Sequence, residues 1–70
     1  MSTQSGEGVS LLRLNTVKAR TGLSRSGVYR AISDGTFPAP IHIAGTRVAL
    51  WPSNDVDTWI ASAVEMARGA

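Results

Sequence analysis

The sequence contains no cysteine, which excludes disulfide bonds and thiolate metal sites and fits a reducing, cytosolic setting. Its single histidine, His42, has no second histidine or cysteine with which to hold a metal, so we expect no metal site and no cofactor. The apolar runs are far too short to span a bilayer, and the first residues lack the basic head and apolar middle of a signal peptide. We therefore expect no membrane contact.

Acidic residues are scarce in the first two thirds of the chain. Between Val9 and Leu50 a single acid, Asp34, stands against six basic residues, which gives this part a charge of +5, whereas Trp51 to the end carries −2. A small domain polarised in this way is expected to present one face to a polyanion such as nucleic acid. Charge alone leaves a second interpretation open, in which these residues only keep a small protein in solution.

A catalytic machinery is also missing. No serine and acid stand at a spacing that would assemble with the one histidine, and there is no glycine-rich phosphate loop of the nucleotide-binding type. A chain of 70 residues leaves little room for a sheltered pocket. We therefore do not expect an enzyme.

Two short helices joined by a tight turn are expected between Asn15 and Gly35. Asn15 is a good N-cap and Gly22 a good residue to end the first helix, of about two turns, with Val17 facing inward. Ser24 is the next N-cap and Gly35 the next stop. Two helices joined in this way form a helix-turn-helix.

The second of these helices has two unlike faces. Val28, Ala31 and Ile32 fall on one arc of the helix, which we take as the inward face. The opposite arc is polar, and its members with their two border residues are Ser26, Tyr29, Arg30, Ser33, Arg25 and Gly27.

The segment after Gly35 favours an extended chain, because Pro38 and Pro40 end helices. Residues 41–43 alternate in strand fashion, the "AGT" that follows supplies a turn, and the "RVALW" of residues 47–51 returns as a second strand. A hairpin of this size is too small to stand alone and must pack on the helices. A short extended stretch is expected at residues 11–14, ahead of the first helix.

A third helix comes after the hairpin and is expected to be capped by Ser53 or Asn54 and to end near Arg68. Asp55 and Asp57 lie in its first turn, where the helix dipole favours negative charge. Its apolar arc makes it the predicted main core helix and comprises Val56, Trp59, Ile60, Ala63, Val64 and Ala67, with Trp51 near Trp59.

The resulting fold class is mainly α with a small β-hairpin, a winged helix-turn-helix in the order helix, helix, hairpin, helix. Residues 9–70 form this one domain. Residues 1–8, "MSTQSGEG", are small and polar, and we expect a disordered tail there.

The polar face of the second helix has the residue types that read the major groove of DNA. Ser26, Gly27 and Arg30 are expected to face bases, Arg25 a base or a phosphate, and Tyr29 a phosphate. An ordinary solvated helix face is the alternative. The full set of residues expected to contact DNA is Ser24, Arg25, Ser26, Gly27, Tyr29, Arg30, Ser33, Thr46 and Arg47.

Gly27 and Arg47 each have a second explanation. A glycine inside a helix costs about 1 kcal/mol relative to alanine, so Gly27 implies either a close approach to DNA or close packing against the first helix. Arg47 lies beside the hairpin turn, where it would reach the minor groove or the backbone next to the helix, or else would lie in solvent.

Taken together, residues 11–61 resemble the AlpA family of phage-type transcriptional regulators, a branch of the MerR-like winged helix-turn-helix group shared with many excisionases. The resemblance rests on "TGLSRSGVYR" at 21–30, "DGTFPAPI" at 34–41, a glycine hairpin and "DVDTWI" at 55–60. It implies that residues 25–33 enter the major groove and that residues 44–47 form a wing. The family often has a threonine or similar side chain where this chain has Gly27, and a glycine has no side chain with which to read a base.

We therefore expect a sequence-specific regulator of transcription that binds double-stranded DNA in several copies, in the cytoplasm of a bacterium and associated with its nucleoid. RNA polymerase or an integrase is a further expected partner. One alternative is an excisionase that bends attachment-site DNA. An alternative of another class is a protein-interaction module, in which the arginines would be dispensable.

Overall fold

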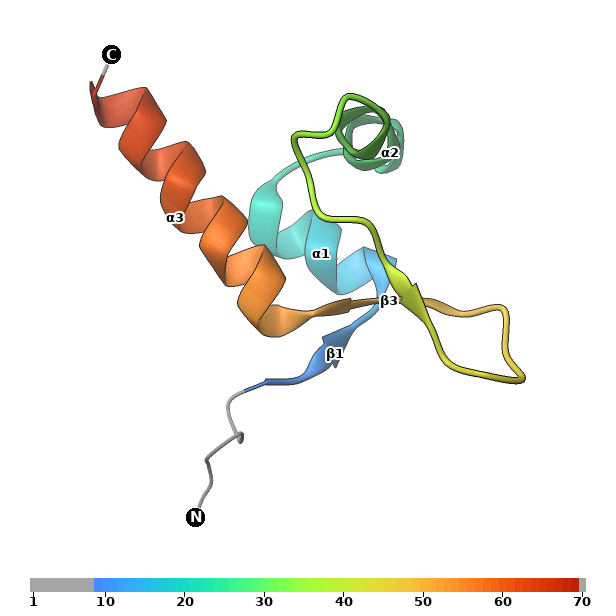
Figure 1. Cartoon of the computed structure of the whole chain (residues 1–70). Coiled ribbons are helices and arrows are strands. Elements are labelled where there is room, and N and C mark those ends of the chain that lie inside the picture. Colours follow the sequence, from blue (N-terminus) through green and yellow to red (C-terminus); the bar gives the residue numbers. More distant parts are fainter. Residues whose placement is uncertain (1–8, 70) are drawn as a thin grey trace.

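The computed structural model describes residues 9–69, and the sheet strands and helices within them come in the order β1, α1, α2, β2, β3, α3 (Figure 1). This order confirms the predicted fold class, a mainly helical winged-helix-like domain with a small sheet. The expected tail at residues 1–8 lies outside the described residues. No helix in the described range is long and apolar enough to cross a membrane. The bounds are β1 Leu11–Leu12, α1 Leu14–Thr21, α2 Arg25–Ser33, β2 Ile41–His42, β3 Ala49–Pro52 and α3 Ser53–Gly69.

The sheet has one more strand than the predicted hairpin. It is antiparallel with the order β1-β3-β2, because the extended stretch before α1 pairs with β3. Leu12 lies opposite Trp51 in this ladder, and Ile41 lies opposite Leu50 in the ladder between β2 and β3. The two hairpin strands are shorter than predicted, since residues 43–48 form a loop between them.

Helix α1 begins earlier than its sequence suggests. The chain leaves β1 at Leu12, Arg13 is extended, and the Arg13 carbonyl accepts the first helical hydrogen bond from the N–H of Val17 at 3.0 Å. Asn15 is thus inside the helix, and its prediction as N-cap is wrong. Gly22 ends the helix as predicted, with a left-handed φ of 77° that glycine adopts without steric cost.

Helix α2 has the limits that its local sequence predicts. The Ser24 side chain accepts a hydrogen bond from the backbone N–H of Gly27, so Ser24 is the N-cap. At the other end the helix stops at Ser33, and Gly35 follows with a φ of 79°. Both ends are therefore set by signals within a few residues of the helix.

The core takes one buried side chain from each of the three helices, one from β3 and one from the connection between α2 and β2. All five residues are at most 5% exposed, and partly buried neighbours such as Leu23 and Ile32 pack against them. Burial of these side chains removes apolar surface from water and holds the helices on the sheet. The five are Val17 of α1, Val28 of α2, Phe37 of the connection to β2, Trp51 of β3 and Val56 of α3.

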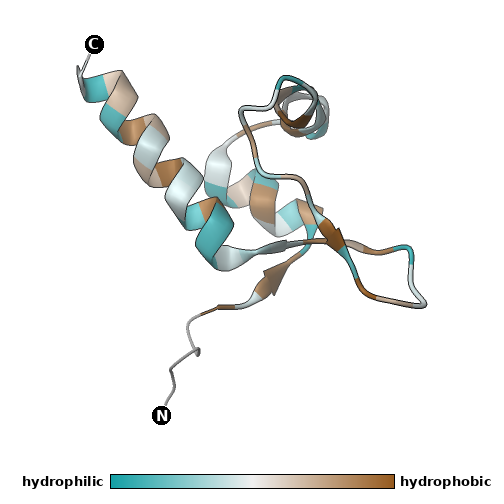
Figure 2. Cartoon of the chain, viewed as in Figure 1, coloured by the Kyte–Doolittle hydropathy of each residue, from teal (hydrophilic) through white to brown (hydrophobic). Residues whose placement is uncertain are grey.

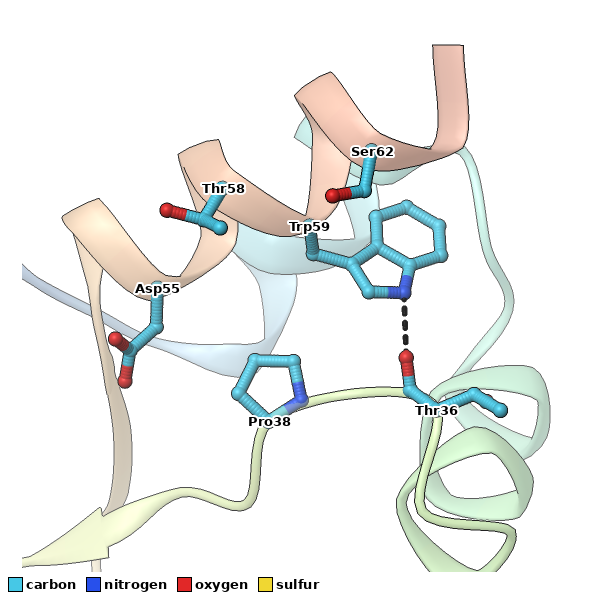
Figure 3. A pocket seen from close by; sticks show the side chains of 6 residues that line it. All are labelled: Thr36, Pro38, Asp55, Thr58, Trp59 and Ser62. Atoms are coloured by element: carbon cyan, nitrogen blue, oxygen red, sulfur yellow. Dashed lines mark hydrogen bonds between the residues drawn. The ribbon is translucent and has the colours of Figure 1, made fainter. Parts of the chain in front are cut away.

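Both tryptophans hold the connection between α2 and β2. The indole N–H of Trp51 donates to the Pro38 carbonyl at 3.0 Å, and that of Trp59 donates to the Thr36 carbonyl at 2.8 Å (Figure 3). Trp59 also meets the Phe37 ring edge to face, at 5.0 Å between centroids. The ring contacts are thus Phe37 for Trp59 and Tyr29 for Trp51, and Trp59 packs against the core cluster that contains Trp51.

Helix α3 is a core helix in its first half alone. Ser53 is its first residue, so Asn54 lies inside the helix and is not its cap; the Ser53 side chain accepts a hydrogen bond from the N–H of Ser10 at 2.8 Å. Val56 is fully buried, whereas Val64 on the same arc is 43% exposed. The second half projects away from the domain, although apolar residues continue along it (Figures 1 and 2).

A shallow groove of about 440 Å³ runs between the first half of α3 and the connection after α2 (Figure 3). Its lining mixes polar and apolar side chains, and it lies against α3 rather than on the polar face of α2. The lining residues are Thr36, Pro38, Asp55, Thr58, Trp59 and Ser62.

Candidate nucleic-acid interface

The start of α2 is built around the hydroxyl of Ser24. This hydroxyl lies 3.0 Å from the backbone N–H of Gly27, which donates to it, and 3.4 Å from the hydroxyl of Ser26. An N-cap satisfies a backbone N–H that the helix itself leaves unpaired. Ser24, predicted to contact DNA, therefore also fixes where the helix begins.

The structure offers a local explanation for the glycine at position 27. A Cβ at this position would lie 3.2 Å from the Ser24 hydroxyl oxygen and 3.7 Å from the Cβ of Leu23. The missing side chain thus points toward the turn between the two helices. Gly27 leaves room for the Ser24 cap, which is a third explanation beside close approach to DNA and packing on α1.

The outward face of α2 carries the polar residues that the sequence placed there. Five of the six predicted contact residues within α2 are exposed and Gly27 is half-buried, while Val28 on the opposite face is completely buried. A helix with one buried face presents its other face in a fixed orientation. The five exposed residues are Arg25, Ser26, Tyr29, Arg30 and Ser33.

Tyr29 connects this face to the sheet. Its ring meets the indole of Trp51 in β3 edge to face, with 6.3 Å between the centroids and 65° between the planes. The guanidinium of Arg25 lies 5.8 Å from the centroid of the same ring. Such a contact between a cation and an aromatic ring is attractive. Sequence spacing carries no signal for the role of Trp51, because it depends on how β3 packs beneath α2.

The loop between β2 and β3 carries the remaining predicted contact residues, Thr46 and Arg47. Gly45 has a φ of 82°, and the N–H and the hydroxyl of Thr46 both donate to the Ile43 carbonyl at 2.9 Å. The Thr46 hydroxyl in turn accepts from the N–H of Val48 at 3.4 Å. Thr46 therefore stabilises the turn, and Arg47 beside it is exposed.

Arg20 is the basic residue whose charge is locally compensated. It forms an ion pair with Asp57, which joins α1 to α3, and this is the one ion pair within residues 9–69. Arg25, Arg30 and Arg47 have no carboxylate partner in that range. Asp57, predicted to act on the helix dipole, is thus engaged with Arg20, and Asp55 is the acid in the first turn of α3.

Helix α2 and the loop of the hairpin lie on the same side of α3, and the projecting half of α3 points the other way (Figure 1). The Tyr29–Trp51 contact ties α2 to β3, the strand that leads out of the loop. The predicted contact residues therefore lie on two separate elements, α2 and the hairpin loop, and both elements are connected to β3. His42 in β2 is exposed.

A helix-turn-helix packed on a small antiparallel sheet defines the class as a small winged-helix-like domain. Within this class, the chain belongs to the family of the prophage CP4-57 regulatory protein AlpA, whose model matches residues 10–64. This confirms the resemblance seen in the sequence and places the chain in a family of phage regulatory proteins.

The chain is similar to the uncharacterized protein ORF88 of Enterobacteria phage P4, with 38% identity over 53 residues. The matched part is 76% of this chain and 59% of ORF88, so the chain spans less than two thirds of that relative. No solved structure matches the chain.

Proposed function

We propose that the protein is a sequence-specific, double-stranded DNA-binding regulator of transcription. The membership in a family of phage regulators supports a regulatory role. In this proposal the protein acts in the cytoplasm of a bacterium, at promoter DNA. Helix α2 enters the major groove, and the loop between β2 and β3 contacts the groove beside it.

The observation that carries the proposal is the pair of arginines on the outward face of α2. Arg25 and Arg30 are exposed and have no carboxylate partner within residues 9–69, while the face behind them is held in the core by Val28. An α-helix fits the major groove, and an arginine donates two hydrogen bonds to guanine. Arg30 and Ser26 are our candidates for base contacts, and Arg25 for a base or a phosphate.

The loop between β2 and β3 is the second contact in this proposal. Arg47 projects from a turn that Thr46 and Gly45 shape, and it is exposed. An arginine near a narrow minor groove or a phosphate gains electrostatic energy. The loop would thus add affinity and fix the orientation of α2.

We further propose that several copies bind together. Helix α2 has nine residues, and one such helix contacts a few base pairs. Tandem or paired sites are then needed for selective binding. Tandem sites should bind each protomer more tightly than an isolated half-site does; equal affinity per protomer would refute this part.

The proposal is tested by selecting bound sequences from random duplexes and measuring affinity for the selected duplex. Arg30→Ala should weaken binding at least 5-fold, since a bidentate arginine–guanine contact is worth about 1–3 kcal/mol. If four or five phosphates are neutralised, the log of the affinity should fall with the log of the salt concentration with a slope of about −4.

Arg68→Ala is the matched control, because Arg68 is an exposed arginine on the far half of α3. It should bind like the wild type. The proposal fails if neither Arg25→Ala nor Arg30→Ala changes binding to the selected duplex. That outcome would favour the protein-interaction module, for which these arginines are dispensable.

The regulator and the excisionase share the same DNA interface and differ in the step that binding leads to. An excisionase bends attachment-site DNA and recruits an integrase, whereas a regulator of transcription acts on RNA polymerase at a promoter. Mapping the selected sequences onto the source genome and measuring the bend in the bound duplex distinguish the two roles.

A further inference from the structure

Three side chains form a continuous row from the sheet to the outward face of α2. Trp51 is fully buried and is held by its hydrogen bond to the Pro38 carbonyl at 3.0 Å. The Tyr29 ring rests against this indole, and the Arg25 guanidinium lies over the Tyr29 ring. We call this row the Trp51–Tyr29–Arg25 stack.

The three members of the stack differ in how far they are buried, and therefore in how freely their side chains can rotate. Trp51 is fully buried, Tyr29 is 39% exposed and Arg25 is exposed. Arginine has a long side chain that loses much rotational freedom when it is fixed at an interface. A ring held from behind by a buried indole restricts that side chain before any ligand arrives.

The spacing within α2 makes the contact possible. Arg25 and Tyr29 are four residues apart, so that their side chains lie on the same side of the helix. Arg25 is the first residue of α2, and the N-terminal residues of a recognition helix approach base edges. The Tyr29 ring therefore acts on an arginine at the end of α2 that approaches base edges.

We propose that Tyr29 is a positioning residue, which orients Arg25 toward a base edge of the DNA through its ring, rather than making a phosphate contact with its hydroxyl. The inference rests on the proposed DNA-binding function and adds a residue that determines its specificity. It makes the ring essential and the hydroxyl dispensable. It also makes the effect of Tyr29 depend on the presence of Arg25.

The test measures affinity of the full chain for the selected duplex by fluorescence anisotropy. Tyr29→Phe keeps the ring and should bind within about 2-fold of the wild type. Tyr29→Leu removes the ring and should weaken binding about 5-fold, the size of a contact between a cation and an exposed ring. In an Arg25→Ala background the same Tyr29→Leu change should have no further effect, within about 2-fold.

Discrimination between base pairs is a second readout, which would not change at one position if Tyr29 had a purely structural role. Tyr29→Leu and Arg25→Ala should lose discrimination at the same base pair of the selected site. Arg30→Ala is the comparison, and it should lose discrimination at another position. Combined with Tyr29→Leu, the Arg30→Ala change should act independently, because Arg30 is outside the stack.

Tyr29→Phe decides the matter even if Tyr29→Leu fails to fold. In the free wild-type protein the Tyr29 ring should shift the proton resonances of the Arg25 side chain through its ring current. Tyr29→Phe should keep this shift, because it keeps the ring. A loss of affinity in Tyr29→Phe of 5-fold or more would overturn the inference, because the hydroxyl would then be the contact. An equal effect of Tyr29→Leu with and without Arg25 would overturn it as well. If the wild type binds no duplex at all, the proposed function itself fails.

Discussion

The indole N–H of Trp51 donates to the carbonyl of Pro38, 3.0 Å away, and this bond fastens the connection after α2 to the central strand of the sheet. The same indole also contacts the Tyr29 ring edge to face and supports it. Trp51, a residue of the hairpin strand β3, thus joins the hairpin to α2, the two elements that the proposal brings to DNA.

Trp51→Phe tests this role in stability. The change removes the hydrogen bond, leaves the Pro38 carbonyl without its donor and opens a cavity in a fully buried site. We expect a loss of about 2 kcal/mol in the free energy of unfolding and a fall in Tm of about 8–16 °C. Trp59→Phe, at a partly exposed site, should lose less than half as much in the same urea and thermal unfolding measurements. Equal losses of stability in the two variants would contradict the larger role that we assign to Trp51.

Gly27→Ala tests whether the glycine serves the Ser24 cap. Alanine improves helix propensity by about 1 kcal/mol, but its Cβ would lie 3.2 Å from the Ser24 hydroxyl oxygen and disturb a cap worth about 1 kcal/mol. We expect Gly27→Ala alone to change the free energy of unfolding by less than about 0.5 kcal/mol.

The matched background for that test is Ser24→Ala, which removes the hydroxyl. There, Gly27→Ala should stabilise the protein by about 1 kcal/mol, the full gain in propensity. Denaturant unfolding of the four proteins of this double-mutant cycle gives the coupling. The same gain in both backgrounds would mean that the cap and the glycine are independent.

Asp57→Asn tests the ion pair between α1 and α3. The side chains of Arg20 and Asp57 are 37% and 55% exposed, so water and salt screen the pair. We expect a loss of less than about 1 kcal/mol, which shrinks further as sodium chloride is raised. A coupling energy above about 2 kcal/mol between Arg20→Gln and Asp57→Asn would show that the pair is a main stabiliser of the fold.

Thr46→Val tests the turn of the hairpin. The variant keeps the shape of the side chain and loses the hydroxyl that bridges the Ile43 carbonyl and the Val48 N–H. We expect faster amide hydrogen exchange at Val48 and a change of less than about 1 kcal/mol in global stability. Thr46→Ser should exchange like the wild type. Unchanged exchange in Thr46→Val would mean that the hydroxyl does not hold this turn.

Features with local signals were predictable from the sequence. The ends of α2 follow from Ser24 and Gly35, and its inward face follows from the positions of Val28 and Ile32. The two prolines after α2 end helical structure, and they made it possible to predict where the hairpin begins. These signals act within a few residues, so that neighbouring elements do not override them.

Features that depend on distant parts of the chain were not predictable. Asn15 is not a cap because β1 pairs with β3 and holds the chain extended as far as Arg13, which lets α1 begin at Leu14. The support of Tyr29 by Trp51 likewise arises from packing between α2 and β3. The apolar arc of α3 was predicted correctly as a pattern, but the pattern does not show that the second half of the helix projects from the domain (Figure 1), where Val64 is 43% exposed.

The central claim is that the outward face of α2 and the loop of the hairpin together contact duplex DNA. Its most direct test is the change in backbone amide resonances when the selected duplex is added to the labelled protein. We expect the largest shifts at Arg25, Arg30 and Arg47, and none at Val64 or Met66 on the projecting half of α3. Unmoved resonances at the three arginines, at low ionic strength and with the duplex in excess, would contradict the account.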